Sequence, residues 1–459
     1  MSGQSEPWQL GAVEIRDAVA AGQLTPREAV ESCLERIDAY EELVGAWEYL
    51  DAERALAEAE SAHPGSLHGV PNGVKDIFNT SDMPTTMGSP AWATFTPGND
   101  ARVVHYARQA GSVVLGKTVT AEFAVHTPGK TRNPHELTRS PGTSSSGSAA
   151  SVACGMVPWS LASQTAGSIV RPASYVGVYG FKPSYGSIAR IGMLKTTDTL
   201  DQVGFFTRSV RDLAPVFDAL RVHGADYPLV HDTLDRHVQV DYRERRPRVG
   251  LVTDALDVWG VAGNEERAAL LAYAKRLEEI GVDVVPASPP GVADAHEIHE
   301  IIYDRCIAYY FDGEARAGTL VSDVILGMWE RGRAITTDQY RAALARQAAM
   351  QREVAVFASD FDALLTLSTS GPAPAFGEPD LKDSALIWTL SGSPVVSAPV
   401  FRTDGGLPFG AQFVSARFRD YDLLDLLAWV EDRDLLSAVE AVTPKAIQAP
   451  TRRMAPRSQ

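Results

Sequence analysis

Residues 139–187 read RSPGTSSSGSAASVACGMVPWSLASQTAGSIVRPASYVGVYGFKPSYGS. Two loops of small residues, PGTSSSGS and SQTAGS, flank an apolar run, and each loop offers serine hydroxyls. A Ser/Gly-rich loop is often a flexible linker, but the apolar run ASVACGMVPWSLA is best buried. We therefore expect both loops to meet at a folded site, with Ser144 and Ser168 as the candidate catalytic hydroxyls.

A nucleophilic serine needs a general base, and the candidate is Lys75 in the strand-like segment HGVPNGVKDIF, residues 68–78. An unpaired charged lysine is costly to bury. Burial lowers the lysine pKa from about 10.4, so that the neutral amine can accept a proton. A salt bridge to the adjacent Asp76, or a side chain that reaches solvent, is the structural alternative.

Other catalytic motifs are absent from the sequence. It contains no G-x-S-x-G elbow and no S-x-x-K pair. His296 and His299, in HEIHE, lack the i, i+4 spacing of a zinc helix. We expect them to be solvated helix residues, and we expect no metal and no other cofactor.

Composition and charge narrow the class of protein. The chain has 459 residues, 45% of them hydrophobic, and a net charge of −16 from 42 basic and 58 acidic residues. The charge argues against nucleic acid and anionic membranes, because both select basic patches. Cys33, Cys154 and Cys306 form no CxxC pattern and predict free buried thiols. Without a signal peptide or a membrane-spanning run, a soluble cytoplasmic protein is expected.

Helical and strand-like segments alternate along most of the chain. Residues 9–60 read as helical, with Thr25 as N-cap and Glu28 completing a capping box. A helix at about 100–110 precedes the strand SVVLGKT, and this succession of helix and strand is typical of an α/β sheet. Residues 294–356 read as nearly all helical. Further strands are expected at GVYGFKP, PRVGLVT, VDVVPA, FDALLTL, SPVVSAPVF and PFGAQFVSA, and further helices at SVRDLAPVFDAL, NEERAALLAYAKRLEEIG and DYDLLDLLAWVEDR.

The long stretch that opens this section, together with HGVPNGVKD, resembles the amidase signature family of Ser-cisSer-Lys hydrolases. DTLDQVGFFTRSVRDL, SGSPVVSAPVF and GLPFGAQFVSARFRD agree with the family in order and spacing, so the resemblance spans roughly residues 9–435. It implies an α/β fold: a single compact domain whose central mixed β-sheet is covered on both faces by α-helices. We expect one amidase-like domain over 1–459, with N-terminal helices at 9–66, a signature core at 67–215, the remaining sheet and a helical pocket region at 216–441, and a tail at 442–459.

The resemblance also implies roles for particular residues. Ser168 would be the nucleophile, Ser144 the bridging serine and Lys75 the base, and a cis peptide bond would hold Ser144. Backbone N–H groups of Thr165, Ala166, Gly167 and Ser168 would form the oxyanion hole. An acyl-enzyme would form on Ser168 and be hydrolysed by water.

The chain departs from the usual family motif at several positions near the expected site. Gln164 stands where the family usually has Asp, and Val170 stands where it usually has Arg, with Arg171 next. One residue rotates a helix by about 100°, so Arg171 is no simple replacement. The other departures are Thr143, Ser146 and Ala166 in place of Gly, and Thr389 in place of a frequent Asn.

The expected function is hydrolysis of C–N bonds in aryl or apolar amides, with carbamate (urethanase-like) or ester hydrolysis as related activities. The partner would be a small-molecule substrate, without nucleic acid or membrane, and the protein would be a monomer or homodimer. One alternative is the glutamine-hydrolysing subunit of a tRNA-dependent amidotransferase, and another is a non-catalytic amidase-like binding protein. The side chains expected to supply an apolar pocket are Ile301, Ile302, Tyr303, Tyr309, Tyr310, Phe311, Met328 and Trp329.

Overall fold

Two parallel strands at the centre of the chain's signature region set the geometry of the molecule. The computed structural model describes residues 6–224, 231–254, 258–318, 320–382 and 384–446. In it, β2 (Pro71–Lys75) pairs in parallel with β4 (Trp159–Gln164), with Val74 opposite Leu161. Because parallel strands end at the same edge of a sheet, Lys75 and the last residues of β4 lie side by side.

The described strands form a single mixed sheet of eleven, in the order β1-β3-β2-β4-β6-β5-β10-β11-β9-β7-β8. β2 is parallel to β3 and β4, and β7 is parallel to β8 and β9. All other neighbours are antiparallel. The remaining bounds are β1 Trp47–Leu50, β3 Val113–Thr118, β5 Tyr179–Lys182, β6 Gln202–Thr207, β7 Arg248–Leu251, β8 Asp283–Pro286, β9 Ala363–Leu367, β10 Val395–Arg402 and β11 Pro408–Val414.

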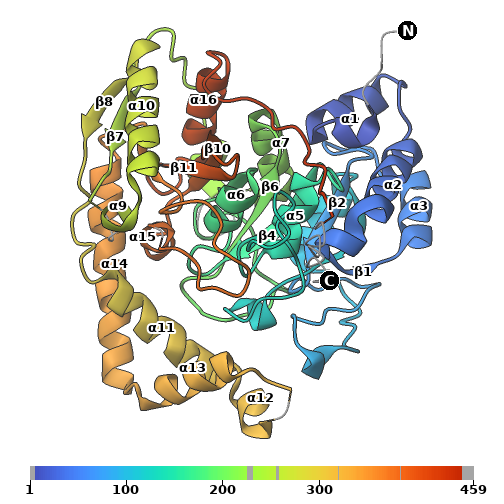
Figure 1. The fold of residues 1–459 in the computed structure, drawn as a ribbon, viewed down its shortest axis with the longest axis horizontal. Helices are drawn as coiled ribbons and strands as arrows, with labels where there is room; N and C mark the ends of the chain where they lie inside the picture. The colour runs from blue at the N-terminus through green and yellow to red at the C-terminus, as the bar shows by residue number, and fades with distance from the viewer. Residues whose placement is uncertain (1–5, 225–230, 255–257, 319, 383, 447–459) are drawn as a thin grey trace, which may run out of the picture.

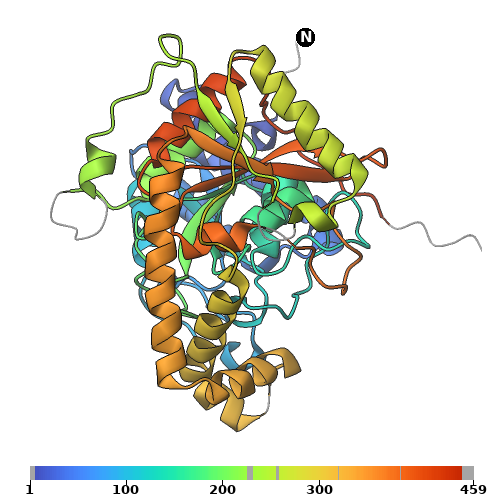
Figure 2. The ribbon, with the colours of Figure 1, turned by 90° about the vertical axis from the view of Figure 1, so that its left-hand side faces the viewer.

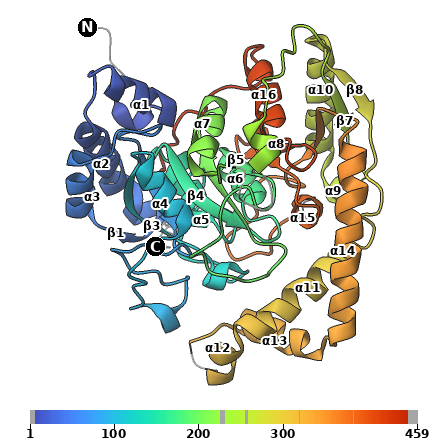
Figure 3. The ribbon, with the colours of Figure 1, turned by 180° about the vertical axis from the view of Figure 1, so that it is seen from behind.

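Helices cover both faces of this sheet, which confirms the expected α/β architecture (Figures 1 and 3). One face packs against α1 (Ala12–Ala20), α4 (Arg102–Gln109), α7 (Val210–Leu220), α10 (Asn264–Glu279) and α16 (Asp420–Glu431). The other packs against α2 (Pro26–Val44), α3 (Ala52–Glu60), α5 (Ser146–Ala153), α6 (Val170–Val176), α11 (Ala295–Tyr310), α14 (Thr337–Ala358) and α15 (Ala385–Leu390).

Several strands contribute to the cores on both faces because side chains alternate along a strand. Val114 of β3 packs with the first group of helices, whereas Val113 and Leu115 pack with the second. The central strands β3, β4 and β6 are buried along their whole length. This burial explains the apolar run 113–115 at the start of β3.

The N-terminal segment is less uniformly helical than expected. Thr25 caps α2 and accepts a hydrogen bond from the Glu28 N–H, as predicted. Residues 9–60 are interrupted by β1, however, an edge strand that pairs with β3. Aromatic side chains at Trp47 and Tyr49 favour a strand, and pairing with β3 stabilises a segment too short to be recognised alone.

An arm of helices extends from the sheet on the side away from α1 (Figures 1 and 2). It consists of α11, α12 (Asp312–Ala317), α13 (Asp323–Ala334) and α14, so the helical prediction for 294–356 is largely confirmed. The short helices α8 (His231–Asp235) and α9 (Val258–Val261) and the 3-10 turns at Pro7–Gln9, Pro90–Trp92 and Glu122–Ala124 complete the described elements. Most of the expected tail, from 447 onward, lies outside the described residues.

The described helices include none that is long and apolar enough to cross a membrane. Cys33, Cys154 and Cys306 are free and buried, as predicted. Burial raises the pKa of the Cys33 thiol to about 12, so this group stays protonated at neutral pH.

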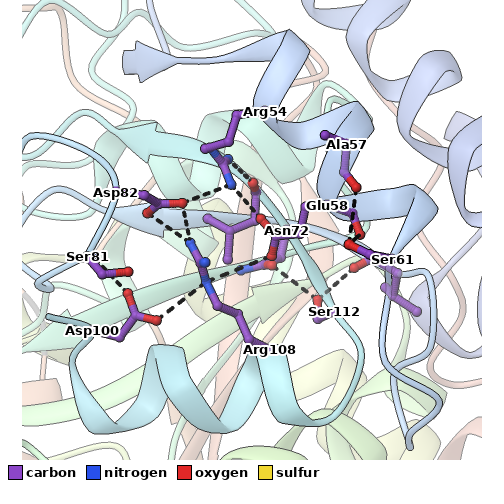
Figure 4. Close-up of polar contacts among 12 residues, drawn as sticks. Arg54, Ala57, Glu58, Ser61, Asn72, Ser81, Asp82, Asp100, Arg108 and Ser112 are labelled. Carbon is purple, nitrogen blue, oxygen red and sulfur yellow. Dashed lines mark hydrogen bonds and ion pairs between the residues drawn. The ribbon is translucent and has the colours of Figure 1, made fainter.

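A network of ionic side chains ties α3 and α4 to the loop after β2 (Figure 4). Asp82 lies 3.2 Å from Arg54 and 2.9 Å from Arg108, and Arg108 also lies 3.6 Å from Asp100. Arg54 donates to Glu58 and to the Val114 carbonyl of β3. Both arginines are mostly buried, so the network fixes helices against the strands that flank Lys75.

We expect Asp82→Asn to lower the free energy of unfolding by about 1–2 kcal/mol, because hydrogen bonds to charged groups are worth roughly 1.5–3 kcal/mol and solvent weakens this one. Urea unfolding followed by tryptophan fluorescence measures the change. The matched control is Asp338→Asn, whose carboxylate is 96% exposed and 3.8 Å from Arg341. Equal unfolding midpoints for the two variants would contradict a stabilising network.

Candidate active site

The amine of Lys75 lies at the end of β2 in a fully buried position, surrounded by three serine hydroxyls. Its Nζ is 2.6 Å from Oγ of Ser144, 2.9 Å from Oγ of Ser145 and 2.9 Å from Oγ of Ser163. Ser144 and Ser145 come from the first Ser-rich loop, and Ser163 comes from β4. The two arms of the signature stretch therefore meet at the lysine, and the second arm does so through Ser163.

Burial lowers the pKa of Lys75 well below its ordinary value, and the Asp201 carboxylate opposes that shift. The adjacent Asp76 does not pair with Lys75: its carboxylate lies 3.0 Å from Lys117 instead. The salt bridge considered from the sequence is therefore replaced by a hydroxyl cage, which solvates either form of the amine. A lysine in this setting is suited to accept a proton at neutral pH.

The backbone of Ser144 is held by two hydrogen bonds to its carbonyl. These come from the Thr120 hydroxyl at 3.0 Å and the Ala121 N–H at 3.3 Å. The described residues contain no cis peptide bond, so the expected cis bond at Ser144 is not found. The Ser144 hydroxyl reaches Nζ of Lys75 from a trans backbone, and the contact does not depend on a cis bond.

The loop that carries Ser144 is packed closely against the strands beside it. Gly147, in the first turn of α5, lies so near Ala46 and Val119 that a Cβ at this position would overlap their backbone atoms. The Gly147 N–H also bonds the Val119 carbonyl at 3.0 Å. Glycine at this position thus lets the helix start directly behind the serines.

Ser168 lies in the turn between β4 and α6 and is half-buried. Its hydroxyl has no hydrogen-bond partner in the described part of the chain. The structure thus joins Lys75 and Ser144 directly and leaves the Ser168 hydroxyl available at the turn that follows β4. This placement is compatible with the role of nucleophile.

The backbone of the same turn carries a row of unpaired N–H groups among the described residues. The N–H groups of Thr165, Ala166, Gly167 and Ser168 have no partner among the described residues. Three of the carbonyls are bound: that of Thr165 accepts from His299 Nε2 at 2.9 Å, that of Ala166 from the Thr389 hydroxyl at 2.7 Å, and that of Gly167 from the Arg171 N–H at 2.9 Å. Unpaired consecutive N–H groups are the donors that an oxyanion requires.

Several residues at the site were not singled out from the sequence. Ser145 and Ser163 were visible only as members of Ser-rich segments, and no spacing rule distinguished them. The expectation for His299 was wrong: it is buried, not solvated, because α11 packs onto the turn that carries Ser168. Burial lowers the His299 pKa to about 4, so the ring is neutral and can donate from Nε2.

A cavity of about 540 Å³ opens beside this turn. Ala166, Thr143 and Arg171 line it on the side of the signature loops, and Asp380 lines it from the loop before α15. Asp380 lies 2.9 Å from the Arg171 guanidinium and also accepts a hydrogen bond from Thr143. The carboxylate therefore links the residue before Ser144 to the first turn of α6.

The aromatic side chains expected to form a substrate pocket do not line this cavity. Tyr303, Phe311 and Met328 are buried in a core cluster with Phe123. Tyr309 and Tyr310 line a separate cavity of about 370 Å³. Residue type alone had suggested a pocket, whereas the amphipathic packing of α11 and α13 places most of these side chains in the core.

Comparison with known proteins gives a consistent family assignment. Residues 28–424 match the family model described as Amidase. One subunit of the glutamyl-tRNA(Gln) amidotransferase of Thermus thermophilus is 33% identical over 487 residues, covering 96% of this chain and 98% of the relative. A crystal structure of an amidase matches with a TM-score of 0.81 and 31% identity over 92% of this chain and 100% of its own. A 6-aminohexanoate cyclic dimer hydrolase, solved with substrate, matches with a TM-score of 0.83 and 26% identity, covering 93% and 97%.

We expect Asp201→Asn to move the acid limb of the kcat/KM profile to lower pH. Asp201 raises the pKa of Lys75 against the effect of burial, so removing its charge lowers that pKa and keeps the amine neutral in more acidic solution. The test is a pH–rate profile with an amide substrate. Asp198→Asn, in the same loop but half-exposed, is the control and should leave the limb in place. A limb that stays fixed in Asp201→Asn would show that it does not report Lys75.

Proposed function

The chain belongs to the amidase signature family, and from that premise we propose that it hydrolyses amide C–N bonds through an acyl-enzyme on Ser168. The single observation that carries the proposal is the buried Lys75 amine bonded to Ser144 and two further serine hydroxyls. This arrangement supplies a base at neutral pH without histidine or metal ligands.

The proposed reaction assigns one role to each of these groups. As the Ser168 oxygen attacks the substrate carbonyl carbon, its proton passes to Ser144, and the Ser144 proton passes to Lys75. The N–H groups of the turn stabilise the oxyanion. When the C–N bond breaks, the same relay returns a proton to the leaving amine. Water then attacks the carbonyl carbon of the acyl-enzyme, and its proton passes through Ser144 to Lys75. The carboxylic acid leaves as that proton returns to the Ser168 oxygen.

The cavity beside Ala166 favours an apolar or aryl acyl group. Two of its charged residues, Arg171 and Asp380, pair with each other, and Glu378 and Lys382 line it as well. The lining also includes apolar side chains from the arm, from the loop before α15 and from α15 itself: Val324, Phe376, Leu381 and Leu386. Carbamates and esters of similar shape pass through the same tetrahedral intermediate, so they belong to the same substrate class.

A second candidate function is glutamine hydrolysis within a tRNA-dependent amidotransferase. The observation that favours it is the similarity to the Thermus thermophilus protein over nearly the full length of both chains. This relationship supports the second candidate more strongly than a stand-alone amidase, whereas the paired charges in the cavity support the first. In the second case the ammonia released at Ser168 would be passed to a partner, and RNA would be bound by the assembly.

A non-catalytic binding protein is disfavoured because Lys75, Ser144 and Ser168 are all present and two of them are in hydrogen-bond contact. We expect Lys75→Ala and Ser168→Ala each to reduce kcat by at least roughly 10³-fold, since removing one member of such a unit removes most of its effect. Circular dichroism should show an unchanged fold. A fluorophosphonate should label wild type and not Ser168→Ala. Near-normal turnover by either variant would contradict the proposed mechanism.

A hydrolysis panel separates the two candidates. We expect aryl and apolar amides to be cleaved with a kcat/KM at least about tenfold above that of glutamine, because Arg171 and Asp380 of the cavity are paired with each other and apolar side chains lie beside them. Glutamine, acetamide, an anilide, a phenyl carbamate and a phenyl ester form the panel. If glutamine is the best substrate, or if it becomes so when the other proteins of an amidotransferase are added, the second candidate replaces the first.

A further inference from the structure

We propose that Gln164 and Thr389 are positioning residues that orient the N–H groups of the Ser168 turn toward the oxyanion. The inference deepens the proposed function and rests on it. We call these two side chains the neutral brace. They lie 225 positions apart in the chain and are hydrogen-bonded to each other, with Gln164 Nε2 donating to Thr389 Oγ1 at 3.0 Å.

Gln164 is the last residue of β4, and its buried amide binds the start of the next helix. Its Oε1 accepts from the N–H groups of Ile169 at 2.8 Å and Val170 at 3.0 Å. These donors belong to the first turn of α6, where a helix has no internal partners for them. Gln164 thereby ties the residue after Ser168 back to the strand before it and closes the turn.

Thr389, near the end of α15, fixes the middle of the turn. Its buried hydroxyl donates to the Ala166 carbonyl at 2.7 Å, and the Ala385 carbonyl lies at 3.1 Å as a second acceptor. A trans peptide is planar, with its C=O and N–H on opposite sides. Holding the Ala166 carbonyl toward α15 therefore points the Gly167 N–H in the opposite direction.

The same geometry applies to both neighbouring peptides. His299 binds the Thr165 carbonyl and so directs the Ala166 N–H, and the Arg171 N–H binds the Gly167 carbonyl and so directs the Ser168 N–H. Three successive carbonyls of the turn thus accept hydrogen bonds from residues outside it. The N–H groups of the residues that follow each carbonyl have no partner among the described residues. Thr389 is in turn hydrogen-bonded to Gln164, which lies at the end of β4, the strand that leads into the turn.

A neutral side chain at position 164 has a specific advantage here. The related family usually has Asp at this position and Arg at 170, and this chain has replaced both, with Gln164 and the buried Val170. A carboxylate could accept from Ile169 and Val170 but could not donate to Thr389. It would also place a negative charge next to Ser163, which contacts Lys75.

A carboxylate at position 164 would change the pKa of Lys75. The acidic groups around Lys75 are Asp201, whose charge raises its pKa, and Asp76, which is paired with Lys117. A further carboxylate on β4 would raise the pKa of Lys75 and favour its protonated, inactive form. An amide avoids this effect while making one more hydrogen bond than a carboxylate can make.

The first test compares Thr389→Val, which removes the hydroxyl at constant shape, with Thr389→Ser, which keeps it. We expect Thr389→Val to lower kcat by at least about tenfold, a smaller loss than the roughly 10²–10³-fold seen when an oxyanion donor is lost outright, with KM changed less than about twofold. Thr389→Ser should recover to within about threefold of wild type. Thr207→Val is the matched control, since Thr207 is buried and donates to the Ser209 carbonyl away from the site.

The rate of fluorophosphonate labelling of Ser168 is measured on the same proteins and needs no knowledge of the natural substrate. It should fall in Thr389→Val in parallel with kcat. If wild type labels but cleaves no amide, the proposed function fails and the labelling comparison still decides on the brace. Equal labelling rates in wild type and Thr389→Val, or a change in KM alone, would overturn the inference.

The second test is Gln164→Glu, which exchanges one donor nitrogen for a charged oxygen. We expect kcat/KM to fall by at least about tenfold and the acid limb of the pH profile to move to higher pH, because the added charge raises the pKa of Lys75. Gln351→Glu is the control, since its Nε2 binds the Leu390 carbonyl at 3.1 Å and it is outside the turn. An unmoved limb with a normal rate would refute the role of the neutral side chain. Thermal melting checks the fold, and if Gln164→Glu does not fold, the Thr389 series decides alone.

Discussion

A primary amine buried among hydroxyls, with no carboxylate bonded to it in the described part of the chain, is the constraint on which the structure depends. Such a group can be accommodated only if every surrounding oxygen is placed accurately. The parallel pairing of β2 with β4 provides this accuracy, because it fixes Lys75 and Ser163 from two neighbouring strands. The close packing at Gly147 then brings the Ser144 loop onto the same point.

The remainder of the site is arranged by contacts from distant parts of the chain. α11 contributes His299, α15 contributes Thr389, and the loop before α15 contributes Asp380, all of them behind or beside the signature segment. None of these side chains supplies a nucleophile or a base. They hold backbone and loops, so a turn of small residues, which is intrinsically flexible, is kept in one conformation.

The sequence allowed much of this to be predicted, and the reasons for success and failure are physical. Apolar runs and helix caps such as Thr25 identified most elements, because local patterns determine them. Lys75, Ser144 and Ser168 were proposed because their segments resemble a known motif, and the structure shows contact between the first two. His299 and the neutral brace were not assigned roles, since their contacts join residues 134 to 225 positions apart. β1 was missed because an edge strand of four residues is defined by its partner rather than by its own sequence.

The order of strands also has a consequence for synthesis of the chain. β10 and β11 lie between β5 on one side and β9 with β7 and β8 on the other, so the last strands to be made join the two halves of the sheet. Until they are present, β5 is an open edge and Thr389 has not reached the turn at Ser168. An emerging chain therefore holds all three signature side chains well before it holds an organised oxyanion site. Pairing of β10 with β5 also covers a strand edge that is otherwise open to other chains.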